Sequence, residues 1–408
     1  MSATDFSTTS IFDSAILVLS DIHASTTDPT KSDAPSYVSS KPSAAFGGID
    51  PFDNMVRTVR ALGTRISCLI CAGDLTNLGD PSGVAYVWNK LGEVASELDA
   101  RLLVATPGNH DLDSRYLYTE YDARGQAMLL MPTLPVRSRA TYLEFWAEHF
   151  AFVELADSRI LLLNSSAYHG GGKNPEEERE NGRVSAPTLR RIESELARLP
   201  IKPVNVLICH HHPDDPEEIL ENDRSVMEGG KKLLHLLNDS NVGPWLVIHG
   251  HKHRPRLFYS GGSGDTPLVL GSASFSAQIN RDATNKCPNQ FHIVEFNAQG
   301  ATQIGVGLAG IIRSWNWTIG EGWNPAQGPY GLPHRSGFGF RGNIALVANR
   351  VRSLIPDGQF RRWCDLVNEI PELEFLLPKD YQKLRANFRT LGIELLEKEG
   401  VPAQVARK

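Results

Sequence analysis

Acidic, amide and imidazole side chains gather in five short stretches of this 408-residue chain, and each stretch directly follows an apolar run. The stretches read DIH at 21–23, GDLTN at 73–77, GNHD at 108–111, HHHP at 210–213 and HGHKH at 249–253. Carboxylate, amide and imidazole groups supply oxygen and nitrogen donors without thiolate. Such donors suit divalent ions such as Mn, Fe, Zn or Co better than copper(I) or an iron–sulfur cluster. The pattern therefore predicts a metal site.

Seven residues in these stretches are the candidate ligands. One ion with open positions needs about three or four protein donors, so seven donors indicate two ions that share one carboxylate. The D-x-H and H-x-H spacings place both members of a pair on one side of a fraying strand. Gly250 lets the backbone turn close to the ions because it has no Cβ. The candidate ligands are Asp21, His23, Asp74, Asn109, His211, His251 and His253.

Each stretch also has an ordinary structural explanation. A single aspartate after a strand is more often a turn or a helix cap than a ligand, and a single D-x-H is a weak signal. Five such stretches in order, each closing a buried strand, are hard to obtain by chance. The joint pattern therefore favours the metal site.

Eight apolar runs predict the strands that must position these side chains. The runs are continuous rather than alternating, which indicates strands buried on both faces. Helical patterns lie between many of them, at 53–63, 84–99, 140–150, 187–198 and 226–238, so we expect a layered α/β fold. The C-terminal ends of parallel strands share one edge, where distant residues meet. The runs lie at 15–20, 67–73, 101–108, 159–165, 204–209, 245–250, 266–273 and 291–296.

Composition narrows the class of protein. With 41% hydrophobic and 22% charged residues, the chain is typical of a globular protein with a sizeable core. The net charge of −6 argues against a dominant nucleic-acid or membrane surface. We expect no membrane span and no signal peptide, because no apolar run approaches roughly 20 residues and the N-terminus lacks a basic segment. Five cysteines fit free thiols in a cytoplasmic protein.

The sequence changes character near residue 315. An aromatic, glycine- and proline-rich stretch is followed by helical patterns at 343–355, 357–369 and 379–398. We therefore expect a catalytic domain over 12–315, and a linker with a small C-terminal helical module over 316–408. The module either packs on the core as a cap or binds a protein partner or a second copy of the chain.

Together, DIH, GDLTN, GNHD, HHP and GHKH resemble the calcineurin-like metallophosphoesterase superfamily, whose pattern is D-x-H, G-D, G-N-H-[DE], H and G-H-x-H. The resemblance covers about residues 15–275. It implies a two-sheet β-sandwich flanked by helices, in α-β-β-α layers, with two divalent ions at one edge. The implied ligands are Asp21, His23, Asp74 and His253 for the first ion, and Asp74, Asn109, His211 and His251 for the second.

The resemblance also implies the roles of neighbouring residues. His110 would contact the phosphate and donate a proton, and Asp111 would orient His110. The chain departs from the family pattern in having three consecutive histidines before Pro213. Alignment on this proline makes His211 the ligand and leaves His210 as the alternative.

The implied chemistry is hydrolysis of a phosphoester by in-line attack of a metal-bridging hydroxide. We expect a phosphodiesterase that acts on a small phosphodiester or a cyclic nucleotide. The same site serves phosphomonoesterases, such as protein phosphatases and nucleotidases, and a nuclease is a third alternative that the acidic net charge disfavours. A catalytically silent scaffold would have lost ligands, and in this chain every ligand position is filled. The loops at 24–51 and 168–183 are expected to shape substrate choice.

Overall fold

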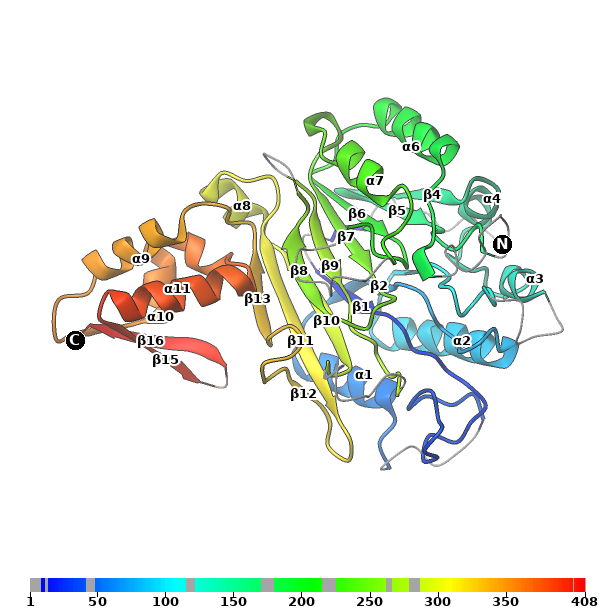
Figure 1. Ribbon diagram of the computed structural model, residues 1–408, viewed down its shortest axis with the longest axis horizontal. Helices are drawn as coiled ribbons and strands as arrows, with labels where there is room; N and C mark the ends of the chain where they lie inside the picture. Colours follow the sequence, from blue (N-terminus) through cyan, green and yellow to red (C-terminus); the bar gives the residue numbers. More distant parts are fainter. Residues whose placement is uncertain are drawn as a thin grey trace.

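Two β-sheets lie face to face between layers of helices in the computed structural model of the protein (Figure 1). The structure describes residues 9–11, 14–41, 48–114, 122–169, 180–214, 225–261, 266–278, 287–398 and 400–407. Most of the predicted loop at 168–183 lies outside these residues. The expected α-β-β-α sandwich is confirmed, as the packing of the two sheets demonstrates.

The first sheet has seven strands in the order β12-β11-β10-β1-β2-β3, with β13 also paired to β11. Its β1, β2 and β3 are parallel, and β10 joins β1 antiparallel. Helices α1 (Pro51–Ala61) and α2 (Pro81–Glu97) cover its outer face. The strands are β1 (Ala15–Leu19), β2 (Ile66–Cys71), β3 (Leu102–Ala105), β10 (Gln290–Phe296), β11 (Gly310–Thr318), β12 (Gly322–Pro325) and β13 (Arg335–Phe338).

The second sheet has six strands in the order β4-β5-β6-β7-β9-β8. Its β5, β6, β7 and β9 are parallel. Helices α6 (Ala186–Arg198) and α7 (Gly230–Leu237) cover its outer face, and α3 (Ala123–Met128) and α4 (Arg139–Glu148) lie in the connection from β3 to β4. The strands are β4 (Phe150–Glu154), β5 (Ser158–Leu163), β6 (Val204–Ile208), β7 (Trp245–His249), β8 (Arg256–Tyr259) and β9 (Leu268–Gly271).

The continuous apolar runs are explained by two cores, one on each face of every central strand. In β1, Leu17 and Leu19 pack toward the helices, whereas Ile16 and Val18 pack between the sheets. Successive side chains of a strand point to opposite faces, so a strand buried on both faces must be apolar throughout. All five residues of β1 are buried. No helix in the described part of the chain is long and apolar enough to cross a bilayer.

The aromatic stretch after residue 315 belongs to the first sheet. Strand β11 continues to Thr318, and both β12 and β13 pair with it. Trp315 stacks on Phe291 of β10 with ring centroids 4.8 Å apart, and Trp323 packs edge-on against the same ring. We therefore propose that the domain boundary lies after β13, near residue 340, rather than at 315.

The C-terminal unit has its own hydrophobic core and contains strands as well as helices. The helix predicted over 379–398 is wrong in its second half, because α11 ends at Thr390 and β15 begins at Ile393. Gly392, with φ +70°, takes the left-handed conformation that often ends a helix. The elements are α9 (Ile344–Ser353), β14 (Phe360–Arg362), α10 (Trp363–Glu369), α11 (Pro378–Thr390), β15 (Ile393–Lys398) and β16 (Val401–Arg407).

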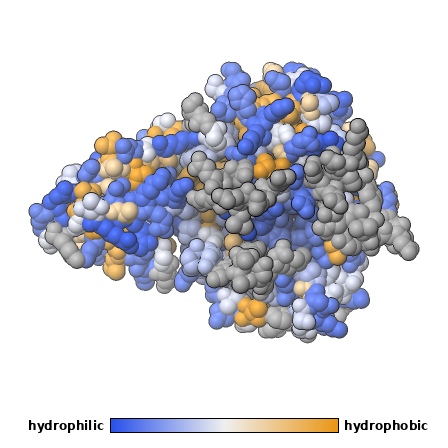
Figure 2. Space-filling view, viewed as in Figure 1, coloured by the Kyte–Doolittle hydropathy of each residue, from blue (hydrophilic) through white to orange (hydrophobic). Residues whose placement is uncertain are grey.

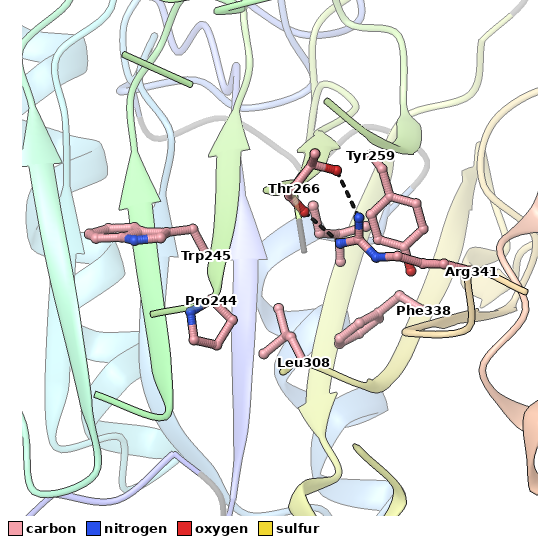
Figure 3. Close-up of a pocket in the computed structure, with 8 residues that line it drawn as sticks. Pro244, Trp245, Tyr259, Thr266, Leu308, Phe338 and Arg341 are labelled. Atoms are coloured by element: carbon pink, nitrogen blue, oxygen red, sulfur yellow. Dashed lines mark hydrogen bonds between the residues drawn. The ribbon is translucent and has the colours of Figure 1, made fainter. Parts of the chain in front are cut away.

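Arg341 joins this unit to the second sheet (Figure 3). Its guanidinium donates to the hydroxyl and the carbonyl oxygen of Thr266, at 2.7 and 2.5 Å, and lies 3.7 Å from the ring centroid of Tyr259. The backbone N–H of Gly339 donates to the Tyr259 hydroxyl at 2.7 Å. The start of the unit thus packs against the β-sandwich. Figure 2 shows hydrophilic side chains over much of the surface of this unit, with apolar ones between them. The exposed apolar side chains of the unit include Leu346, Phe360 and Leu396.

His292 of β10 makes stability depend on pH. Its side chain is fully buried, its Nδ1 lies 2.8 Å from the Ser314 hydroxyl, and its Nε2 has no partner among the described residues. Burial lowers the pKa of His292 to about 3. The unfolded chain therefore binds the proton first, so this contribution to stability is complete above pH 6.5 and is lost as the pH falls toward 3.

We expect His292→Gln to remove that dependence. Between pH 7 and pH 5 the wild type should lose about 2 kcal/mol more unfolding free energy than the variant. Urea denaturation at both pH values measures the difference, and contributions from other histidines cancel. Equal losses in the two proteins would contradict the assignment.

Candidate metal centre

The loops after β1, β2, β3, β6 and β7 meet at one edge of the sandwich. The backbone N–H of His251, after β7, donates to Asp21, after β1, at 3.0 Å to Oδ1 and 3.1 Å to Oδ2. His210, after β6, has its Nε2 3.2 Å from Oδ2 of Asp74, after β2. The two sheets therefore bring residues far apart in sequence into direct contact, as the parallel strand order requires.

One cluster contains Asp21, His23, Asp74 and His253. The Nε2 atoms of His23 and His253 lie 3.0 Å apart. His253 Nε2 is 3.3 Å from Asp21 Oδ1, and His23 Nε2 is 3.6 Å from Asp74 Oδ2. Asp21 and His23 are almost completely buried. These four residues are the set that the resemblance implies for the first ion.

A second cluster contains Asp74, Asn109, His210 and His251. Oδ1 of Asn109 lies 3.0 Å from His210 Nε2 and 3.0 Å from His251 Nδ1. His210 Nδ1 is 2.8 Å from the Ala72 carbonyl, and His251 Nε2 is 2.7 Å from the Glu180 carbonyl. Because a carbonyl only accepts, each imidazole donates a proton to it, and the other ring nitrogen of a neutral imidazole carries a lone pair.

When both imidazoles are neutral, the atoms that face one another in the second cluster are all acceptors. Burial would lower the pKa of His210, but the Asp74 carboxylate raises it to about 9, which shows that positive charge is favoured between these atoms. His210 Nε2, His251 Nδ1 and the Asn109 and Asp74 oxygens present lone pairs at 3.0 to 3.2 Å where hydrogen bonding would require a donor. Buried acceptors that converge without a donor are favourable only around a cation. A backbone carbonyl on the remote nitrogen is also the usual outer partner of a metal-bound histidine. The donor set therefore fits a divalent ion.

Asp74 links the two clusters through one atom. Its Oδ2 is the atom near His23 Nε2 in the first cluster and near His210 Nε2 in the second. Its Oδ1 accepts the backbone N–H of His110 at 2.8 Å, which fixes the carboxylate. Burial alone would raise the pKa of Asp74, but the neighbouring imidazoles hold it well below its usual range. The geometry fits a carboxylate that bridges two cations.

Five of these side chains come from strained backbone. Non-glycine residues rarely adopt positive φ, and such residues concentrate at functional sites. The strain is local to the loops that follow the strands. The residues are Asp21, His23 and Asp74, each with φ 52°, His251 with φ 77° and His253 with φ 54°.

Two glycines make this approach possible. A Cβ on Gly250 would overlap Ser20 Oγ and Asp21 Oδ2, so the expectation that Gly250 allows close approach agrees with the geometry. A Cβ on Gly108 would overlap the carboxylate and the backbone of Asp74. Both positions must therefore lack a side chain.

His211, the ligand that alignment on the proline favours, makes different contacts. Its Nδ1 lies 2.9 Å from the Ser165 hydroxyl, and it is Nε2 of His210, not of His211, that faces Asp74 and Asn109. His211 remains close, because one of its ring nitrogens lies within 4.8 Å of ring nitrogens of His210 and His251. Burial and the neighbouring histidines hold the pKa of His211 well below its usual range.

Sequence reasoning missed Ser165. It follows the apolar run of β5 as the predicted residues follow theirs, but serine is too common after strands for that signal to be used. Its hydroxyl contacts the loop that carries His210 and His211.

His110 and Asp111 lie beside the first cluster. The ring of His110 is partly exposed, lies 4.6 Å from the ring of His23, and accepts the Leu78 N–H on Nδ1 at 3.3 Å. The Asp111 carboxylate accepts the N–H groups of Thr76 and Gly108, at 2.9 and 2.8 Å. Burial raises the pKa of Asp111 to about 7. Asp111 thus orders the loops around His110.

A four-layer sandwich with two clusters of potential metal ligands that share one carboxylate is the arrangement of a dinuclear metal hydrolase. Residues 14–255, more than half of the chain, match the calcineurin-like phosphoesterase family. The protein therefore belongs to that family of phosphoric ester hydrolases. Residues 336–387 match a winged helix-turn-helix domain associated with calcineurin-like proteins. The C-terminal order of helices and strands agrees with this match.

Solved structures give only distant similarity. A purple acid phosphatase from yellow lupin (Lupinus luteus) seeds is 12% identical with a TM-score of 0.45, over 74% of this chain and 51% of that one. This chain thus spans about half of the lupin enzyme. A phosphopantetheinyl hydrolase from Mycobacterium tuberculosis is 13% identical with a TM-score of 0.35, over 68% of this chain and 99% of that one. No curated protein sequence gives a significant match.

We expect Asp74→Asn to lose bound metal at both positions, because the neutral amide removes the charge from the atom that both clusters share. Elemental analysis after Mn²⁺ loading and desalting measures the loss. His110→Ala is the matched control and should keep the wild-type metal content. Unchanged metal content in Asp74→Asn would contradict the bridging role.

Proposed function

We propose that the protein is a metal-dependent phosphodiesterase that acts on a small phosphodiester or a cyclic nucleotide. The observation that supports it is the pair of buried acceptor clusters joined through Asp74 Oδ2. Two divalent ions, when bound, supply an ionised water near neutral pH and positive charge for the phosphoryl oxygens. Mn, Fe, Zn and Co all suit this donor set.

In this proposal the first ion is held by Asp21, His23, Asp74 and His253. The second is held by Asp74, Asn109, His251 and a histidine of the HHHP stretch. We assign that position to His210 rather than His211, because the lone pair of His210 Nε2 faces the Asn109 and Asp74 oxygens at 3.0 and 3.2 Å. The hydrogen bond of His210 Nδ1 to Ala72 fixes the orientation of the ring.

His110 is the proposed general acid. In the neutral ring Nδ1 accepts the Leu78 N–H, so the proton lies on Nε2, where it can hydrogen-bond to the leaving oxygen. Full proton transfer requires the imidazolium form, in which Nδ1 also carries a proton and the contact with Leu78 is given up. The backbone N–H of His110 is tied to Asp74, so the acid and the bridging carboxylate keep a fixed spacing. Asp111 acts as a positioning residue through Thr76 and Gly108.

A second candidate is a nuclease, and the winged helix-turn-helix match is the observation that favours it. The second helix of such a motif commonly docks on nucleic acid. In α11 the exposed Lys379 and Lys383 lie one turn apart on the same face, and Arg389 is also exposed. The net charge of −6 and the ion pair of Lys383 with Asp380 weigh against this candidate. Phosphomonoesterase activity remains the alternative within the same site.

A cytoplasmic location and a protein partner or second copy at the C-terminal unit belong to the same proposal. All five cysteines are free thiols, which suits a reducing compartment. The exposed apolar side chains Leu346, Phe360 and Leu396 suit contact with another protein.

We expect the Mn²⁺-loaded protein to hydrolyse bis-p-nitrophenyl phosphate faster than p-nitrophenyl phosphate, and to lose both activities in a chelator. His110→Ala should retain the metals and lose turnover by a factor of about 10² or more. Release of p-nitrophenol measures both rates. A reversed preference would favour the phosphomonoesterase, and hydrolysis of single-stranded DNA above both would favour the nuclease.

His210→Ala should lower metal content from two ions toward one, because it removes one of four donors of the second ion. The first cluster does not contain His210 and should keep its ion. Elemental analysis of the loaded protein measures the ratio. Two retained ions would contradict the assignment of His210.

A further inference from the structure

Ser165 determines which ring nitrogen of His211 carries the proton. The Ser165 hydroxyl oxygen accepts the backbone N–H of His210 at 3.2 Å and that of His211 at 3.1 Å. These two hydrogen bonds use both lone pairs of the oxygen. The contact of 2.9 Å between Ser165 Oγ and His211 Nδ1 must therefore be made with the serine proton.

It follows that His211 accepts on Nδ1 and carries its own proton on Nε2. A nitrogen that carries a proton offers no lone pair to a metal ion, so His211 cannot be a ligand in this arrangement. His210 has the opposite tautomer, because its Nδ1 donates to the Ala72 carbonyl. In these two adjacent histidines, Nε2 of His210 is thus an acceptor and Nε2 of His211 is a donor.

The Nε2–H of His211 lacks a hydrogen-bond partner among the described residues. The side chain is completely buried. An unsatisfied buried donor costs about 1–3 kcal/mol, so this N–H is expected to have an acceptor when the site is in use. An oxygen of a molecule bound at the site would supply such an acceptor.

His211 lies where such an acceptor would be. Its ring centroid is 4.5 Å from that of His251 and 5.0 Å from that of His210, the two imidazoles of the second cluster. A ring nitrogen of each of the three lies within 4.8 Å of the others. An oxyanion bound at the second ion would therefore be within reach of the His211 donor.

We propose that His211 is a substrate-binding residue that donates its Nε2–H to a phosphoryl oxygen on the side of the second ion, and that Ser165 is the positioning residue that fixes this donor. The inference rests on the proposed phosphoester hydrolase function. It adds a neutral donor to the site, which holds an oxyanion without repelling the adjacent cations. The donor is present for any phosphoryl group, whether diester, monoester or inorganic phosphate.

The test compares His211→Gln with His211→Asn in the full-length Mn²⁺-loaded protein. The Gln amide nitrogen reaches the position of Nε2, whereas the shorter Asn side chain reaches only that of Nδ1. Inorganic phosphate is the probe, with affinity measured by calorimetry and by inhibition of bis-p-nitrophenyl phosphate hydrolysis. We expect His211→Asn to weaken phosphate and raise KM by roughly ten- to a hundredfold, as loss of a hydrogen bond to a charged group would.

His211→Gln should stay within a few fold of the wild type, and Ser165→Ala should fall between the two because the tautomer is no longer fixed. All three variants should keep two metal ions per chain. Loss of an ion in His211→Asn would overturn the proposal, because it would make His211 a ligand. Unchanged phosphate affinity and KM in His211→Asn would also overturn it.

Failure of the proposed function gives a different result. If the wild type hydrolyses no phosphoester yet binds phosphate, and His211→Asn weakens that binding, the enzymatic proposal fails and the His211 site stands. If the wild type hydrolyses phosphoesters and His211→Asn leaves phosphate affinity unchanged, the enzymatic proposal stands and the His211 proposal fails.

Discussion

The candidate metal site depends on a fold that holds the lone pairs of several oxygen and nitrogen atoms close to one another. Oxygen and nitrogen atoms of Asp74, Asn109, His210 and His251 face one another at about hydrogen-bond distance, and no proton lies between them when the imidazoles are neutral. Such an arrangement is unfavourable without positive charge. The rest of the fold holds these atoms in place. Strands buried on both faces fix where each loop begins, and hydrogen bonds between loops, such as the one from His251 to Asp21, fix the loops relative to one another.

Hydrogen bonds on the remote side of each ring decide what each histidine does. In the proposed site, the Ala72 carbonyl leaves Nε2 of His210 as an acceptor for a cation, and the Ser165 hydroxyl leaves Nε2 of His211 as a donor. The two residues are adjacent in the chain and equally buried. Their chemical difference therefore comes from neighbours contributed by β2 and β5, not from their own sequence.

Much of the fold was predictable because burial of a strand on both faces produces a continuous apolar run in the sequence. A run such as AILVL of β1 must be apolar at every position when helices cover one face and a second sheet covers the other. The polar residues that follow such runs are those that the loops bring together at one edge of the sandwich. The proposed choice of His210 over His211 could not be made from the sequence, because it depends on a carbonyl and a hydroxyl that only the fold brings near. The strand β15 was missed because Leu391 and Leu395 continue the helical spacing of α11, while the left-handed turn at Gly392 interrupts it.

The residues with positive φ affect the stability of the backbone and the chemistry of the site in opposite directions. Each non-glycine residue in the left-handed region costs on the order of 1 kcal/mol, and five of them cluster at one edge. The loops that carry these residues are therefore less stable than they would be with glycine at the same positions. Selection for heat tolerance alone would favour replacing these residues by glycine and would discard the chemistry. Backbone stability and the donor set thus place opposite demands on the same five positions.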